Sequence, residues 1–277
     1  MSIITLTTDF GIKDYYLAKI KAAIISGSPE SVIVDISHEI SPFNIMETAY
    51  IIENSYQNFP EKSIHIIGVD SEKNPENTHL VVKLNNQYFI CADNGVMSIV
   101  CNQIKPDGIY EINIHDKIES KNSTLKTFAR VACHLSKGGK PEVIGKKISK
   151  MKSVKSMSPF LNDEGTQMIG SIIYIDNYGN VVTNIKESLF NECCKGRKYE
   201  ISVRNFKFDK IYKNYSEIVD FSIPEEKRSD EGKSMVLFNS SNYLEIAIYK
   251  SNPLNVGTAA SLLGLKIYDS VTINFIK

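Results

Sequence analysis

Short apolar runs and segments with helical spacing alternate along the first half of the chain. Continuous apolar runs predict buried strands over 2–8, 31–37 and 63–70. Apolar residues recur at helical spacing over 15–26, 45–59, 96–104 and 127–139, which predicts helices there. Between two further apolar runs, the pair Asn85 and Asn86 predicts a hairpin turn. Strands that alternate with helices predict an α/β domain around a central, mostly parallel sheet.

The pattern changes after about residue 150. The segment 150–160 is basic, serine-rich and weakly hydrophobic, which is typical of a connector between domains. Beyond it, β-rich runs separated by turn residues occupy 171–176, 181–185, 199–203, 234–241, 243–249 and 270–276. This pattern predicts a small β-barrel or sandwich. We therefore expect an α/β domain over 1–155 and a smaller, barrel-like all-β domain over 165–277.

Composition and charge limit the kinds of partner that the protein is expected to bind. The 277 residues are 42% hydrophobic, and 32 basic residues balance 32 acidic ones, so no global field favours nucleic acid or anionic lipid. No signal peptide and no apolar run of membrane-spanning length is visible, so we expect no membrane partner. Five cysteines without CxxC spacing predict reduced, buried thiols and a cytoplasmic location. We expect no metal site, the adjacent Cys193 and Cys194 included.

Acidic residues recur where predicted strands end. Asp9, Asp35 and Asp70 each fall at or near such an end. Residues just past the carboxyl ends of parallel strands line a binding crevice, so these three acids could converge on one site. The alternative is that acids here cap helices, as Asp14 could for the helix that begins near Tyr15.

Common catalytic motifs are absent from the sequence. It contains no HExxH, GxSxG, P-loop or GxGxxG string, which removes the usual signatures of zinc proteases, α/β-hydrolases, NTPases and dinucleotide enzymes. His134, on a predicted helix beside alanines, is more typical of a packed core histidine than of a base.

The second half contains two more specific strings. In "YIDNYGNVVTNI", Asp176, Tyr178 and Asn180 alternate, so a carboxylate, a ring and an amide could share one side and bind an ammonium and a purine. The alternative interpretation is an ordinary turn, because "DNYGN" is rich in turn formers. The serine-rich turn in "FNSSNYLEIAIYKSN" offers hydroxyl and N–H groups that suit a carboxylate.

Together these strings resemble a known family. "LTTDFGIKDYYLAKIKAAI", "SPESVIVDISHEISPFNIMETAYII", "ADNGVMS", "IDNYGNVVTNI" and "LEIAI" are similar, in order and over nearly the whole chain, to S-adenosylmethionine (SAM) hydrolases. These enzymes are also called SAM hydroxide adenosyltransferases and are related to the SAM-dependent fluorinase and chlorinase.

The resemblance implies a fold, an assembly and a reaction. The fold is an α/β N-terminal domain joined to a small β-barrel domain, in a homotrimer with each SAM site between subunits. The reaction is attack by water on the 5′ carbon of the ribose, which releases adenosine and methionine. SAM is then the substrate and no cofactor or metal is needed, because the sulfonium is already a good leaving group.

The resemblance also implies roles for individual residues of the N-terminal half. Asp9 would hold the ribose hydroxyls, and Asp14 would lie near the methionine end. Phe43 would pack its ring against the ribose and adenine. Asp70 would position or deprotonate the water.

Further roles are implied for the C-terminal half. Asp176 would hold the methionine ammonium, Tyr178 would stack on adenine, and Asn180 would bond its edge. Ser240 would bind the methionine carboxylate. Ile248 and Lys250 would read adenine through their backbone groups.

The sequence departs from the hydrolase pattern where the nucleophile is handled. An arginine of that pattern falls at Asn77 and a histidine at Ser123, whereas Thr124 falls near a serine that contacts halide in the halogenases. Lys73 and His79 are nearby candidates to replace them. Two alternatives to hydrolysis therefore stay open: a SAM- or adenosine-binding protein with little turnover, and a transferase that uses another nucleophile such as halide.

Overall fold

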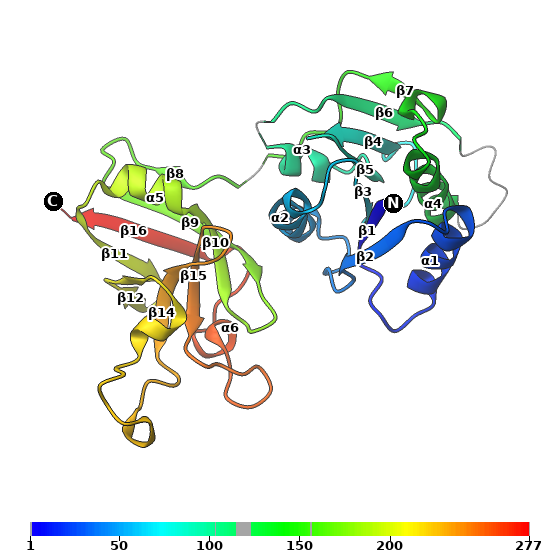
Figure 1. Cartoon of the computed structure of the whole chain (residues 1–277). Coiled ribbons are helices and arrows are strands. Elements are labelled where there is room, and N and C mark those ends of the chain that lie inside the picture. The colour runs from blue at the N-terminus through cyan, green and yellow to red at the C-terminus, as the bar shows by residue number, and fades with distance from the viewer. Residues whose placement is uncertain (1, 103, 115–122, 156, 277) are drawn as a thin grey trace. The chain divides into compact units, whose positions relative to one another are not determined.

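The computed structural model describes residues 2–102, 104–114, 123–155 and 157–276 (Figure 1). It divides into two compact units, Met1–Ser156 and Met157–Lys277, each with its own core. Within the described ranges, no helix has the length and apolar character required to cross a membrane.

The N-terminal unit is built on a seven-stranded sheet. Its strands are β1 (Ile3–Thr8), β2 (Val32–Ser37), β3 (Ile64–Gly68), β4 (His79–Leu84), β5 (Gln87–Ala92), β6 (Gly108–Ile112) and β7 (Gly145–Ile148). They lie in the order β2-β1-β3-β5-β4-β6-β7. The β1–β2, β1–β3 and β3–β5 pairs are parallel, whereas β4–β5, β4–β6 and β6–β7 are antiparallel. The sheet is therefore mixed, and the prediction of a mostly parallel sheet was wrong.

The hairpin between β4 and β5 is one reason for the mixed directions. Asn85 and Asn86 both have positive φ, 50° and 59°, which suits the tight turn that joins antiparallel strands. The sequence predicted this hairpin, and the structure confirms it. Because β6 and β7 continue from β4 in antiparallel steps, the parallel part of the sheet is confined to β2, β1, β3 and β5.

Helices cover both faces of this sheet. They are α1 (Tyr16–Gly27), α2 (Ile45–Ser55), α3 (Val96–Cys101) and α4 (Ser123–Ser136), with short 3-10 turns at Tyr56–Asn58 and Pro141–Val143. Figure 1 shows α1 and α4 on one side and α2 and α3 on the other. Alternate residues of β1 explain this layering, since Ile4 and Leu6 are fully buried in the core under α1 and α4.

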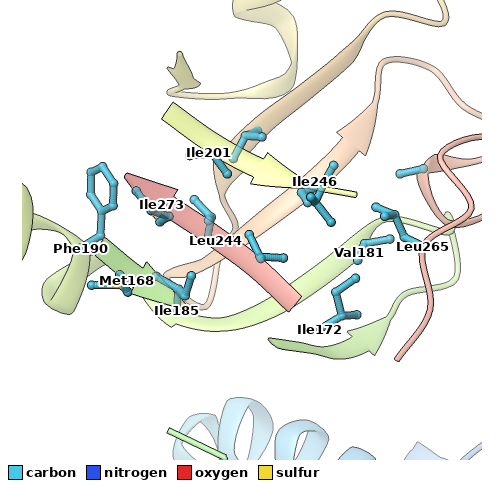
Figure 2. Close-up of a cluster of buried hydrophobic side chains, with 14 of the residues drawn as sticks. Met168, Ile172, Val181, Ile185, Phe190, Ile201, Leu244, Ile246, Leu265 and Ile273 are labelled. Carbon is cyan, nitrogen blue, oxygen red and sulfur yellow. The ribbon is translucent and has the colours of Figure 1, made fainter. Parts of the chain in front are cut away.

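The C-terminal unit is a barrel-like sheet whose strand pairs are antiparallel, except for the parallel pair β13–β14. Its strands are β8 (Phe160–Leu161), β9 (Gln167–Ile175), β10 (Val181–Lys186), β11 (Lys198–Val203), β12 (Phe206–Phe208), β13 (Ile211–Tyr212), β14 (Ser234–Phe238), β15 (Tyr243–Ile248) and β16 (Ser270–Ile276). They lie in the order β12-β11-β16-β9-β10-β15-β14-β13, with β8 on β9. Figure 2 shows buried side chains from several of these strands packed together, among them Ile172, Leu244 and Ile273.

Neither of the two α-helices described in this unit was predicted. Helix α5 (Glu187–Cys194) follows β10 and buries Phe190, Cys193 and Cys194 in the barrel core. It is only eight residues long, too short to show a helical period. A single further turn, α6 (Ala259–Leu262), is capped by Thr258, and 3-10 turns lie at Tyr215–Ile218 and Glu225–Lys227.

All five cysteines are buried free thiols. Burial raises the pKa of Cys101 to about 11 and raises the pKa of Cys91 further. Cys91 and Cys101 therefore stay protonated at neutral pH and act as small core residues. Within the described ranges, no group of three or more His, Cys, Asp or Glu side chains could hold a metal ion.

Candidate active site

The carboxyl ends of the parallel strands bring two of the predicted acids to one edge of the sheet. Thr8 of β1 lies directly opposite Gly68 of β3, so Asp9 and Asp70 follow within two residues of a paired position. A Cβ atom at position 68 would lie 3.2 Å from the Phe10 ring, so glycine here leaves room for that ring to pack against the end of β3. Polar side chains at such an edge of an α/β sheet usually face a ligand.

Asp9 and Phe43 are joined by a hydrogen bond. The main-chain N–H of Phe43 donates to Asp9 Oδ2 at 3.0 Å, although the residues are 34 positions apart. Phe43 has φ of 63° and its side chain is 73% exposed. Asn44 follows it and caps α2 by accepting from Glu47 N at 3.1 Å, which fixes the loop. A large exposed ring held in this way is suited to contact with a ligand or a partner.

Asp35 has a different environment from the other acids. It lies inside β2, and its carboxylate forms an ion pair with Lys21 Nζ at 2.5 Å and lies 3.1 Å from His38 Nε2. Burial alone would raise the pKa of Asp35, but the hydrogen bonds and charges of Lys21 and His38 lower it overall. His38 is fixed from its other side by Thr8 Oγ1, 2.7 Å from Nδ1. Asp35 is thus a partner of Lys21 and His38, and its described contacts do not include Asp9 or Asp70.

Asp14 is exposed and does not cap α1. The N-cap position of that helix is Tyr15, and it makes no side-chain capping hydrogen bond. The capping interpretation considered for Asp14 is therefore not supported, and its carboxylate faces solvent in front of the helix.

Two asparagine side chains surround Asp70. Asn77 Nδ2 and Asn94 Nδ2 each donate to the main-chain oxygen of Asp70 at 3.2 Å. Asp70 itself is half-buried and has φ of 43°. Asn77, at the position where the hydrolase pattern has arginine, therefore lies against Asp70 rather than in solvent.

The other residues considered as replacements for the missing arginine and histidine differ in their environments. His79 is fully buried, places its ring 4.7 Å from that of Phe128, and contacts the main-chain oxygen of Ser71 through Nε2 at 2.9 Å. Lys73 is exposed. Thr124 is half-buried in the first turn of α4; Ser123 begins that helix, and its side chain lies outside the described residues.

In the C-terminal unit, Asp176 organises the turn between β9 and β10. Its Oδ1 accepts from Tyr178 N at 2.9 Å and from Asn180 N at 2.8 Å, and its Oδ2 accepts from Asn180 Nδ2 at 3.1 Å. The turn considered as an alternative in the sequence is therefore present. It places the Tyr178 side chain outward, 64% exposed, while Asn180 is 5% exposed.

The loop after β15 lies beside this turn. Ser251 Oγ donates to the main-chain oxygen of Tyr178 at 3.4 Å, so Ile248 and Lys250 are close to it. Ile248 is buried within the ladder opposite Ser234. Lys250 is exposed, has φ of 51°, and pairs with Glu231 at 2.6 Å, which raises the pKa of Lys250. Ser240 differs, because it is exposed in the turn that leads into β15, at the opposite end of that strand.

A buried acid that the sequence reasoning missed lies between these two ends. Glu245, in the middle of β15, is 3% exposed and accepts from Tyr215 Oη and, at 3.2 Å, from Asn239 Nδ2. Asn180 Nδ2 reaches Tyr215 Oη at 3.5 Å, so the network extends to Asp176. Burial raises the pKa of Glu245, the two hydrogen bonds lower it in part, and the Asp176 carboxylate raises it further. The available signal was a glutamate inside the apolar string "YLEIAI".

Comparison with protein families matches both halves of the chain. A model described as the SAM hydroxide adenosyltransferase N-terminal domain matches residues 4–145, and one described as the C-terminal domain matches residues 170–272. The chain belongs to the SAM hydroxide adenosyltransferase family. The resemblance inferred from the sequence strings is thereby confirmed.

Individual members of the SAM hydroxide adenosyltransferase family match this chain over most of its length. A Methanocaldococcus jannaschii protein named (R)-S-adenosyl-L-methionine hydrolase is 27% identical over 282 residues, which cover 99% of this chain and 96% of that protein. A Thermus thermophilus protein of the same name is 22% identical over 280 residues, 94% of each. The solved structure of a conserved Thermotoga maritima protein is also similar to this one, with a TM-score of 0.83 and 28% sequence identity. The match covers 98% of this chain and 99% of that chain.

Proposed function

We propose that this protein hydrolyses SAM to adenosine and L-methionine by attack of water on the ribose 5′ carbon. The observation that carries the proposal is membership of both halves in the SAM hydroxide adenosyltransferase family. The relatives named (R)-S-adenosyl-L-methionine hydrolase support it, since the chain covers 94% or more of two of them.

The chemistry requires alignment more than activation. The C–S bond breaks with its electron pair going to sulfur, so the cationic sulfonium leaves as the neutral thioether of methionine. Water supplies the new C–O bond and releases one proton. The protein must hold water in line with the leaving sulfur and partly desolvate it. We assign the orientation of that water, and acceptance of its proton, to Asp70, and no metal or cofactor takes part in the proposal.

The N-terminal unit contributes the ribose contacts in this proposal. The Asp9 carboxylate accepts hydrogen bonds from the ribose hydroxyls, and Phe43, whose N–H is bonded to Asp9, packs its exposed ring on the sugar and base. Asp14 lies near the methionine end. The negative charges of Asp9, Asp14 and Asp70 also favour a cationic substrate.

The C-terminal unit contributes the contacts to adenine and the amino acid. Tyr178 stacks on adenine, which its 64% exposure allows. The Asp176 carboxylate holds the turn with three hydrogen bonds and can accept a further one from the methionine ammonium. Asn180 is assigned to the adenine edge. Ser240 is assigned to the methionine carboxylate. The backbone groups of Ile248 and Lys250 are assigned to adenine.

The assembly is part of the same proposal. We expect a homotrimer, with each site completed by residues from two subunits. Light scattering on the purified protein measures this directly, and a monomer with full turnover would contradict it.

One observation favours a second candidate function. Asn77 occupies the arginine position of the hydrolase pattern and Ser123 its histidine position. A protein that keeps the binding residues but lacks these two groups could bind SAM or adenosine with little turnover, or use another nucleophile such as halide.

The test is incubation of the purified protein with SAM in chloride-free buffer, with adenosine and methionine followed by liquid chromatography. Hydrolysis predicts many turnovers, equal release of both products, and no effect of a metal chelator. Asp70→Ala should abolish most of the turnover while SAM still binds. Intact SAM recovered from the wild-type complex would refute hydrolysis and support the binding function. A halogenated adenosine formed on adding halide would support the transferase.

A further inference from the structure

Two side-chain amides converge on one main-chain carbonyl beside the proposed water site. Asn77 Nδ2 and Asn94 Nδ2 both donate to the Asp70 oxygen at 3.2 Å, and Asn94 Nδ2 also reaches Val69 O at 3.1 Å. A carbonyl oxygen has two lone pairs, so these two donors satisfy it fully. Asn77 and Asn94 come from different segments, the loop after β3 and the loop after β5. We call this pair the Asp70 clamp.

The clamp acts on a residue with an unfavourable backbone conformation. Asp70 has φ of 43°, in the left-handed region of backbone conformation that residues other than glycine rarely adopt. Such a conformation costs free energy and persists only where its surroundings hold it. Positive φ changes the direction in which a side chain leaves the chain, so the conformation of Asp70 decides where its carboxylate points.

Asn77 also leaves one of its own atoms unsatisfied. Because the Asp70 carbonyl can only accept, the amide nitrogen of Asn77 must face it, and this fixes the position of Oδ1. Asn77 Oδ1 is buried without a hydrogen-bond partner among the described residues, and the residue is 7% exposed. An apolar side chain of the same shape would avoid this unfavourable burial. A role in stability alone does not account for asparagine here.

The loop that carries Asn77 is fixed at several points. The Asn74 and Asn77 main chains pair with each other, His79 Nε2 contacts Ser71 O at 2.9 Å, and Asp93 N donates to Thr78 O at 2.7 Å. Asn94 is fixed as well, since its Oδ1 accepts from Val96 N at the start of α3 at 3.1 Å. Both amides are therefore held in place before any substrate binds.

We propose that Asn77 is a positioning residue: together with Asn94 it holds the Asp70 main chain in its left-handed conformation and so directs the Asp70 carboxylate at the reacting water. The inference rests on the proposed hydrolysis for its functional consequence. Asn77 would thus serve the reaction from the arginine position of the hydrolase pattern without contacting substrate.

The test compares three variants of the full-length protein. Asn77→Leu keeps the shape of the side chain but removes both the donor and the unsatisfied oxygen. Asn94→Asp keeps the acceptor for Val96 N and removes the second donor. Asn74→Asp is the control, because it makes the same chemical change as Asn94→Asp, in the loop that carries Asn77, while keeping the acceptor for Glu76 N. Each is measured for kcat, for SAM affinity by calorimetry and for Tm, and the crystal structure of Asn77→Leu is determined.

The proposal predicts that Asn77→Leu lowers the activity of the protein without lowering its stability. For Asn77→Leu, kcat should fall by about tenfold or more with SAM affinity within about threefold of wild type, Tm should not fall, and Asp70 should leave the left-handed region. Asn94→Asp should also lower kcat, and Asn74→Asp should behave as wild type. Asp70 that keeps its φ in Asn77→Leu, or a kcat that falls only in parallel with Tm, would overturn the inference. If wild type binds SAM without turnover, the proposed function fails, and the conformation of Asp70 in Asn77→Leu still decides whether the clamp exists.

Discussion

The main-chain N–H of Phe43 donates a hydrogen bond of 3.0 Å to the carboxylate of Asp9. This contact joins the end of β1 to the loop before α2, and so connects the two residues assigned to the ribose. Because Asp9 Oδ2 accepts this bond from the Phe43 loop, Oδ1 remains available for the ribose hydroxyls in the proposed function. The site is thus organised partly by the same acid that is expected to bind the ligand.

Replacing Asp9 by asparagine should separate these two roles. The amide oxygen can still accept from Phe43 N, so we expect Tm to stay near the wild-type value. Loss of a charged acceptor for the ribose should cost about 1.5–3 kcal/mol, or roughly 10- to 150-fold in kcat/KM. Asp35→Asn is the matched control, because that acid pairs with Lys21 and His38 instead, and its kcat/KM should stay close to wild type. Equal losses in both variants would contradict the assignment of Asp9.

Tyr178→Ala should weaken SAM binding without affecting the fold. The side chain is 64% exposed, so its removal should change the free energy of unfolding by less than about 0.5 kcal/mol. Loss of stacking on adenine should cost about 1–3 kcal/mol of binding, measured by calorimetry with SAM and with adenosine. Tyr178→Phe keeps the ring and should bind nearly as wild type. Wild-type affinity in Tyr178→Ala would remove this residue from the site.

His65 should make the protein less stable in mild acid. The ring is fully buried, hydrogen-bonded to Thr5 Oγ1 at 2.8 Å and Gln87 Oε1 at 2.7 Å, and stacked on Phe89. Burial lowers the pKa of His65 to about 4, so the unfolded chain takes up a proton below pH 6.5 that the folded chain does not. Stability present above pH 6.5 should therefore be lost as the pH falls toward about 4, by roughly 3 kcal/mol from this residue.

Urea unfolding at a series of pH values measures this loss. His65→Gln should be less stable at neutral pH but should lose less stability between pH 6.5 and 4. A variant with the same pH dependence as wild type would show that another group titrates there.

Glu245 should have the opposite dependence on pH. Because burial raises the pKa of Glu245 above its ordinary 4.5, the folded protein binds this proton more tightly than the unfolded chain does. Its contribution to stability is present in full below pH 4.5 and is lost as the pH rises through the folded-state pKa. Glu245→Gln cannot ionise, so the stability of wild type relative to this variant should fall with rising pH. A difference in unfolding free energy that stays constant with pH would contradict this.

Most of the longer helices and strands could be read from the sequence because they are continuous local patterns, whereas the strands β6 and β7 were not predicted. The strands around Ile66 and Ile246 are unbroken apolar runs, and the Asn85–Asn86 turn has the residues that a tight hairpin requires. The strand directions across the whole sheet could not be read in this way, since a buried strand has the same composition whether its neighbours run parallel or antiparallel.

Candidate site residues could be proposed from the sequence only where they follow strand ends or lie in a distinctive string. Asp9 and Asp70 were proposed through their positions, and Asp176 through "DNYGN". The Glu245 network was missed because Tyr215 lies 30 residues from its partner, with no local pattern that connects them. The contact of Asn77 with Asp70 was missed for a similar reason, since it depends on how the loop turns back after β3.

Turnover of SAM in ¹⁸O-labelled water, with both products analysed by mass spectrometry, tests the proposed hydrolysis most directly. Attack of water on the ribose 5′ carbon predicts the label in the 5′-hydroxyl of adenosine, no label in methionine, and loss of both products in Asp70→Ala. Adenosine without label, or SAM that remains intact on the wild-type protein, would contradict it.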